Sequence, residues 1–77
     1  MGAKLPQVSG KETVRAFEHA GFEVSRQRGS HMMMIRHEPQ RTRLTIPNHK
    51  TIAKGTLRSI IRDAGLTVDE FIELLNR

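Results

Sequence analysis

The side chains that could carry out chemistry in this 77-residue sequence are its four histidines. The chain has no cysteine, and it shows no carboxylate pair, no Ser-His-Asp order and no glycine-rich phosphate loop. Histidine titrates near neutral pH, so it can act as a general acid or base. His31, His37 and His49 lie in the middle of the chain, whereas His19 falls in a predicted helix and is interpreted as a surface residue. The intervals between the first three match no common ligand spacing, so we expect no metal site.

Basic side chains surround these three histidines. Residues 24–58 hold eight Lys and Arg and a single acid, Glu38, a net charge of +7, whereas the whole chain carries +5. Clustered positive charge of this kind is typical of proteins that bind the phosphates of nucleic acids. We therefore predict phosphate contacts from Arg26, Arg28, Arg36, Arg43, Lys50, Lys54 and Arg58. The three phenylalanines occupy predicted core positions, so recognition is expected to use phosphates and 2′-hydroxyls rather than base stacking.

His31 has the position best suited to catalysis, because it follows Gly29-Ser30 in a predicted hairpin turn. Strand pairing fixes the backbone of such a turn while the side chain projects into solvent. Beside a phosphodiester held by cations, an imidazole there could deprotonate the 2′-hydroxyl or protonate the 5′ leaving oxygen. From spacing alone, His31 is either an ordinary polar residue at a strand start or such a catalyst. His37 and His49 are candidates for a second titrating group.

The elements that must position these residues follow from hydrophobic periodicity and capping signals. Capping boxes at Ser9–Glu12 and Thr67–Glu70, together with apolar stripes at helical spacing, predict three helices, at about 10–20, 54–64 and from 67 onward. Alternating residues predict strands at about 22–27 and 43–46, and a further strand is expected at about 31–37, between tight turns at Gly29-Ser30 and Glu38-Pro39. In the first strand, Phe22, Val24 and Arg26 alternate with Glu23, Ser25 and Gln27.

The order α-β-β-β-α-α indicates an α+β two-layer sandwich, with the helices on one face of a three-stranded antiparallel sheet. Double-stranded-RNA-binding domains share the order α-β-β-β-α. We expect one domain over residues 1–77, with its core in about 10–76 and a poorly ordered segment over 1–8. Of Met32, Met33 and Met34, alternate residues are expected in the core and the others on the open face, where they could help a protein partner dock.

No stretch approaches the roughly 18 apolar residues of a membrane span, and the lack of cysteine fits a reducing compartment. We therefore expect a cytoplasmic protein with no membrane contact. The residues alone also allow two functions without catalysis. The protein could be a non-catalytic RNA- or DNA-binding module that uses the same basic face, or an adaptor for an acidic protein. Incubation with RNA separates the module from a ribonuclease, because binding without products favours the module.

Several motifs in fixed order resemble the HicA (YcfA-like) toxins, the mRNA-cleaving toxins of HicA–HicB toxin–antitoxin systems. These motifs are Gly29-Ser30-His31, Arg36-His37, Leu44-Thr45-Ile46-Pro47 with His49 nearby, and Lys54-Gly55-Thr56-Leu57-Arg58 running into Asp63-Ala64-Gly65. The resemblance spans about residues 10–76. It implies a double-stranded-RNA-binding-like fold, cofactor-free cleavage of single-stranded or structured mRNA, growth arrest, and neutralisation by a HicB-type antitoxin. It also implies that His31 is the catalytic residue and that Gly29 and Ser30 shape its turn.

Overall fold

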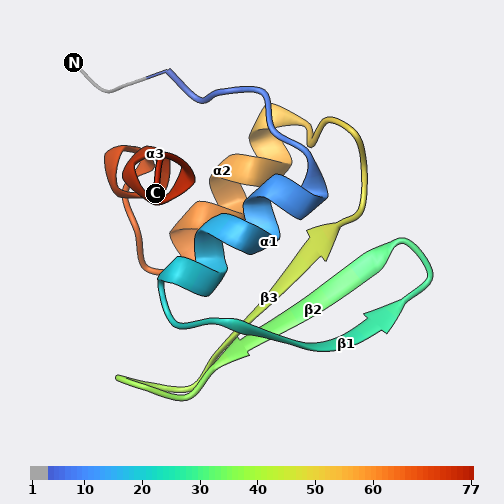
Figure 1. The fold of residues 1–77 in the computed structure, drawn as a ribbon, viewed down its shortest axis with the longest axis vertical. Helices are drawn as coiled ribbons and strands as arrows, with labels where there is room; N and C mark the ends of the chain where they lie inside the picture. Colours follow the sequence, from blue (N-terminus) through green and yellow to red (C-terminus); the bar gives the residue numbers. More distant parts are fainter. Residues whose placement is uncertain (1–3) are drawn as a thin grey trace.

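The computed structural model describes residues 4–77 as an antiparallel sheet with three helices on one side of it (Figure 1). The elements follow the order α1 (Gly10–His19), β1 (Glu23–Arg28), β2 (His31–Arg36), β3 (Thr42–Pro47), α2 (Lys54–Asp63) and α3 (Val68–Leu75). This confirms the predicted α+β class and the α-β-β-β-α-α order. The strands lie side by side in the order β1-β2-β3, α1 and α2 cover one face of the sheet, and α3 packs against these two helices. Within residues 4–77, no helix covers the other face, which is called the open face.

Two of the three helices begin with the predicted capping boxes. The Ser9 hydroxyl accepts a hydrogen bond from the Glu12 amide at 3.1 Å, and the Glu12 carboxylate accepts one from the Ser9 amide at 2.9 Å. These bonds hold the pKa of Glu12 below its ordinary value, since they stabilise the charged carboxylate. Thr67 and Glu70 start α3 in the same way. Helix α2 follows Ala53 and has no side-chain cap.

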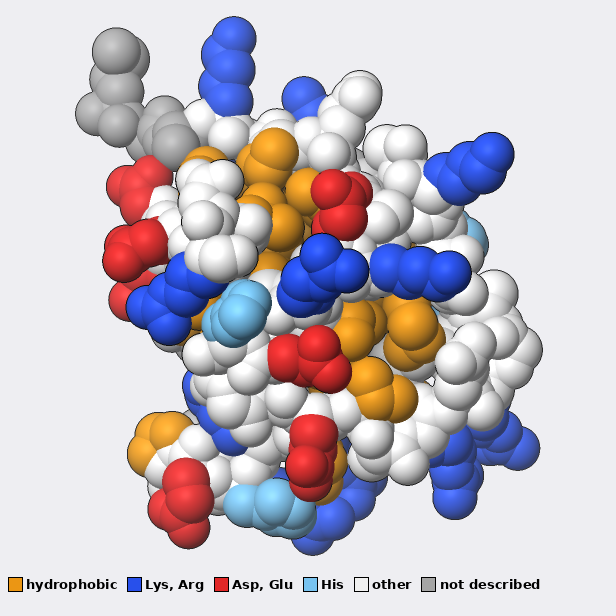
Figure 2. All heavy atoms as spheres, in the orientation of Figure 1, with side chains coloured by type: hydrophobic (Ala, Val, Ile, Leu, Met, Phe, Trp, Pro, Cys, Tyr) orange, Lys and Arg blue, Asp and Glu red, His pale blue; other side chains and the backbone are white. Residues whose placement is uncertain are grey.

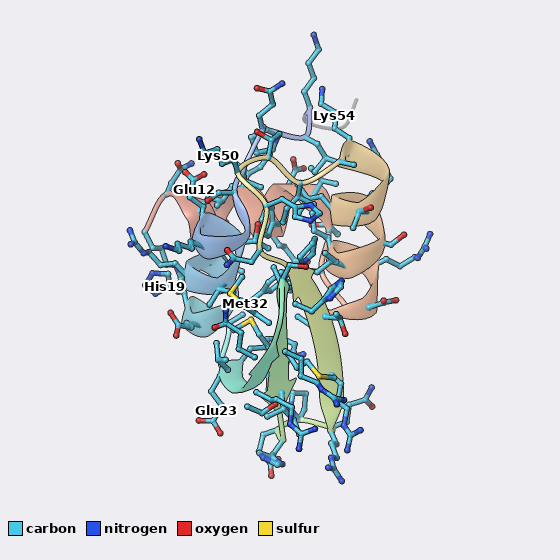
Figure 3. The ribbon with its side chains drawn as sticks, turned by 90° about the vertical axis from the view of Figure 1, so that its right-hand side faces the viewer. Glu12, His19, Glu23, Met32, Lys50 and Lys54 are labelled. Carbon is cyan, nitrogen blue, oxygen red and sulfur yellow. The ribbon has the colours of Figure 1, made fainter. Side chains whose placement is uncertain are left out.

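The core lies between the helices and the covered face of the sheet. Phe17 of α1 is fully buried, with its ring centroid 5.6 Å from that of Phe22 and 5.4 Å from that of Phe71. Met32 and Met34 are buried beneath the helices, as the alternation predicted, whereas Met33 is only half-buried. Figure 3 shows Met32 between α1 and the strands. Burial of alternate residues fixes the register of β2 against the helices.

The core begins earlier in the chain than the sequence indicated. Leu5 and Val8 are 6% and 4% exposed, and the Val8 carbonyl accepts a hydrogen bond from the Ile52 amide at 2.8 Å. The expectation of a poorly ordered segment over residues 1–8 is therefore wrong for these two residues, because buried apolar side chains and a backbone bond fix them. Residues 1–3 of that segment lie outside the described residues. Among residues 4–77, no helix has the length and apolar character needed to cross a membrane.

Candidate active site

The open face of the sheet carries side chains in rows that the strand register sets. Directly opposed residues on neighbouring antiparallel strands point to the same face. The rows are Arg28–His31–Pro47, Arg26–Met33–Thr45 and Glu23–Ile35–Arg43. His31 therefore stands at one end of the open face, next to Arg28. Lys and Arg side chains project from the lower margin of the molecule in Figure 2, beneath the sheet as Figure 1 draws it.

A β-bulge in β1 decides which of its residues share this face. The pairing passes over Ser25, because Val24 pairs with Met34 and Arg26 pairs with Met33. The Ser25 hydroxyl donates a hydrogen bond to the Met33 carbonyl at 3.2 Å. An extra residue on one strand reverses the side to which every later residue of that strand points.

The bulge changes the interpretation of the first strand. Simple alternation puts Arg26 on the same side as Phe22 and Val24, which is the side toward the helices. In the structure, Arg26 and Arg28 instead lie on the open face, in the rows of Met33 and His31. Two of the predicted phosphate-binding arginines are thus brought to the side of the candidate catalytic residue.

The turn before His31 is a two-residue hairpin loop. Gly29 has a φ of +54°, in the region that residues with a side chain rarely adopt, and no non-glycine residue described in the structure has a positive φ. Glycine at the first loop position is typical of type II′ hairpins. The Ser30 carbonyl accepts a hydrogen bond from the Asn48 amide at 2.6 Å. The turn that presents His31 is therefore hydrogen-bonded to the loop after β3.

The loop after β3 is also hydrogen-bonded to the start of α1. The Gly10 amide donates a hydrogen bond to the His49 carbonyl at 2.9 Å. A Cβ on Gly10 would collide with the Pro47 carbonyl oxygen and touch Asn48, so glycine is required for this close approach. Bonds from two separate elements thus hold the backbone on either side of His49.

His31 and His49 line one pocket of about 380 Å³. Both are exposed. Ala53 and Thr56 contribute another wall, so the first turn of α2 also borders the pocket. That turn has no side-chain cap and no acidic residue. Its free amides and the positive end of the helix dipole favour an anion such as a phosphate. Two imidazoles beside a phosphate position are the groups that acid–base cleavage of a phosphodiester requires.

The remaining cations occupy two regions. Arg43 lies on the open face, in the row of Ile35. Lys54 and Arg58 stand four residues apart on α2, so they share one side of that helix, and both are exposed. Figure 3 shows Lys50 and Lys54 at one end of the molecule and Glu23 at the other.

Arg36 is used by the fold. Its guanidinium donates hydrogen bonds to the carbonyls of Ala20 and Ala64, at 3.1 and 3.3 Å, and its central carbon lies 4.4 Å from the centroid of the Phe22 ring. Ala20 and Ala64 are the C-caps of α1 and α2, where unpaired carbonyls favour a cation. The structure therefore gives the predicted phosphate contact of Arg36 no support. The sequence already held a sign of this, because Arg36 is two residues from the core residue Met34 and so points to the same side of β2.

His37 does not join the pocket. It follows the last residue of β2, whereas His31 is the first, and a six-residue strand spans about 20 Å. It lines a different depression, with Arg36 and Glu38. His49 is thus the only predicted auxiliary histidine that the structure brings to the pocket of His31. Over residues 4–77, no three His, Cys, Asp or Glu side chains gather as metal ligands would.

The uncapped start of α2 and Thr56 were not predicted from the sequence to belong to the site. The sequence does mark the uncapped start, because Ser9 and Thr67 cap α1 and α3, whereas Ala53 occupies the equivalent position before α2. An alanine there leaves the first amides to another partner. Thr45 and Pro47 complete the pocket, and no local pattern marks them.

Fold and site together define a small α+β protein with a basic open sheet face and a two-histidine pocket at the start of a helix. Residues 10–66 match the family described as "HicA toxin of bacterial toxin-antitoxin", and the chain belongs to this family. The family places it among the toxins of toxin–antitoxin systems. Searches of curated proteins and of solved structures gave no match to the chain.

Proposed function

We propose that this toxin is a metal-independent endoribonuclease that cleaves mRNA with His31 and His49 as its acid–base pair. The observation that carries the proposal is that both imidazoles line one pocket with the uncapped start of α2. The family supports it, because the chain belongs to the HicA toxins. Cleavage of mRNA in the cytoplasm would block translation and arrest growth.

The reaction is a transfer of the phosphodiester within the RNA. One imidazole removes the proton of the 2′-hydroxyl, and the 2′-oxygen forms a bond to phosphorus. The bond from phosphorus to the 5′-oxygen breaks, and the other imidazole gives a proton to that oxygen. The products are a 2′,3′-cyclic phosphate and a 5′-hydroxyl. Arg28 and the first amides of α2 stabilise the negative charge that builds on the phosphoryl oxygens.

The other cations hold the RNA backbone on either side of the pocket. Arg26 and Arg43 contact phosphates along the open face, and Lys50, Lys54 and Arg58 contact them beside α2. Phosphate contacts position the strand without reading its sequence. We further propose that a HicB-type antitoxin neutralises the toxin by covering this exposed basic face.

The direct test is cleavage of a labelled RNA by the purified chain in the presence of a chelator. We expect His31→Ala and His49→Ala each to lower the cleavage rate by about 10² to 10⁴-fold, the usual contribution of general acid–base catalysis. His19→Ala is the matched control, since His19 is an exposed histidine at the end of α1, outside the pocket, and should leave the rate unchanged.

Two further measurements define the chemistry. A 2′-deoxy substitution at the cleaved nucleotide should abolish cleavage there, because the nucleophile is missing. The 3′ ends of the products should carry cyclic phosphate. Prolonged binding without products, or equal rates for wild type and His31→Ala, would contradict the proposal and favour a non-catalytic RNA-binding module. In cells, induction of the wild type, but not of His31→Ala, should deplete mRNA and stop growth.

A further inference from the structure

A second hollow lies on the open face of the sheet, next to the candidate active site. Its volume is about 320 Å³. The half-buried side chains of Met33 and Ile35 line it, and the exposed Arg26, Arg41 and Arg43 stand around them. We propose that this groove binds one unpaired nucleobase of the RNA strand, a site that rests on the proposed function because it extends the path of the same substrate.

The chemistry of the groove matches a nucleotide in both of its parts. A nucleobase is a flat and weakly polar ring, which packs on aliphatic and thioether surface and stacks on guanidinium planes. The phosphates on either side of the base are anions, which the arginines around the groove attract. Met33 and Ile35 thus take the place of the aromatic platform that the sequence lacks.

The position of the groove favours RNA over a protein partner. Met33 is two residues from His31 in β2, on the same face, so the two side chains lie about 7 Å apart along the strand. Stacked nucleotides follow one another at about 3.4 Å, so this distance corresponds to about two of them. A strand whose phosphate sits beside His31 therefore places a base within two nucleotides of that phosphate over the groove.

The groove also restricts the form of the substrate. A paired RNA helix keeps its bases inside and presents phosphates and 2′-hydroxyls. A concave apolar floor offers such a helix no contact, whereas it can accept a base that is turned out of a single strand. The inference is therefore that the RNA is single-stranded at this point and that one base within two nucleotides of the cut contributes to the choice of cleavage site.

The groove owes its shape to the bulge in β1. The Ser25 hydroxyl donates a hydrogen bond to the Met33 carbonyl, and the bulge places Arg26 opposite Met33. Bulges increase strand twist and redirect side chains, and they are frequent near functional sites. Without the extra residue at Ser25, the side chain at Arg26 would point toward the helices.

The test compares two fluorescent octamers in a binding assay: octauridylate and a ribose-phosphate octamer that lacks bases. The full chain carries His31→Ala, so that neither probe is cut. We expect the base-bearing octamer to bind about tenfold more tightly, near the lower end of what stacking of one base contributes. Met33→Ser should reduce this preference to about twofold, and Met33→Phe should increase it.

Val24→Ser is the matched control. Val24 is an apolar side chain of the same hairpin, 43% exposed, but it pairs with Met34 and so lies on the other face. This variant should keep the tenfold preference. The Met33→Phe variant keeps the test decisive if Met33→Ser lowers stability, because a larger apolar side chain on an open face should not prevent folding.

Equal binding of the two octamers would overturn the inference. So would a preference that neither Met33 variant changes. If the octamers bind equally and the Met33 variants lose only the binding of an acidic protein partner, the groove is a protein-docking surface and the inference is wrong. A base preference in a wild-type chain that releases no products would contradict the proposed ribonuclease activity alone, whereas cleavage without base preference would contradict the groove alone.

Discussion

Arg36 and Arg43 look alike in sequence, but the structure places them in opposite surroundings. Arg36 joins β2 to the ends of two helices through the carbonyls of Ala20 and Ala64, and it covers Phe22. Arg43 stands exposed on the open face. Replacement of each by methionine keeps a long apolar side chain and removes the guanidinium. We expect Arg36→Met to reduce stability and Arg43→Met to reduce RNA binding.

The size of the stability loss follows from the contacts of Arg36. A hydrogen bond from a charged group contributes about 1.5–3 kcal/mol, and a partly exposed cation–π contact about 0.5–1 kcal/mol. The Nε atom is buried without a hydrogen-bond partner, which is unfavourable, so its removal offsets about 1–3 kcal/mol of this loss of stability. Partial exposure of the group weakens the remaining terms. We therefore expect a loss of about 2–3 kcal/mol, or a decrease in Tm of about 10–20 °C for a domain of this size.

Urea denaturation followed by circular dichroism measures the first effect, and fluorescence anisotropy at several salt concentrations measures the second. Arg43→Met should change the unfolding free energy by less than about 0.5 kcal/mol, as exposed substitutions usually do. It should lower the slope of log K against log salt by about 0.7, the value for one phosphate of a single strand. At a temperature where it is folded, Arg36→Met should keep the wild-type slope. A stable Arg36→Met with a reduced slope would refute this assignment of roles.

Three other substitutions test how the site is held. Gly10→Ala should destabilise the protein by about 1–3 kcal/mol and reduce RNA cleavage, because its Cβ would press on the Pro47 carbonyl; thermal unfolding and the cleavage rate measure both effects. Gly55→Ala should raise stability by about 0.5–1 kcal/mol, since its Cβ meets no atom within 4 Å, yet weaken RNA binding by crowding the first turn of α2. Glu12 has a lowered pKa, so its charge stabilises the fold above the ordinary carboxyl pKa of about 4.3, and this contribution disappears as the pH falls through the lowered value. The difference in urea midpoint between wild type and Glu12→Gln should therefore shrink at acidic pH.

Local signals predicted the helices and most of the sheet. Ser9 with Glu12, and Thr67 with Glu70, mark the starts of α1 and α3 correctly, because a capping box involves residues only three positions apart. The strand β2 was likewise recognisable, because turn residues mark both of its ends. The bulge at Ser25 was not, because a bulge is a property of the pairing between two strands rather than of one strand's residue types.

The candidate site could be predicted only in part, for the same reason. Gly29 and Ser30 mark the turn of His31, since hairpin loops have a local signature. Nothing near His49 in the sequence says that it approaches His31. That proximity depends on the bond between Asn48 and Ser30, which joins residues far apart in the chain.

Charge alone therefore could not separate the arginines that are exposed on the open face from the one that holds the fold together. Arg26 and Arg36 carry the same charge in neighbouring strands, and both were predicted to bind phosphate. The alternation of β2 turns Arg36 toward the helices, where the carbonyls at two helix ends accept hydrogen bonds from it. One extra residue in β1 turns Arg26 outward, opposite Met33. The basic face of this toxin thus depends in part on the register of the sheet, because a change that shifts β1 by one residue would turn Arg26 and Arg28 away from it without altering the net charge.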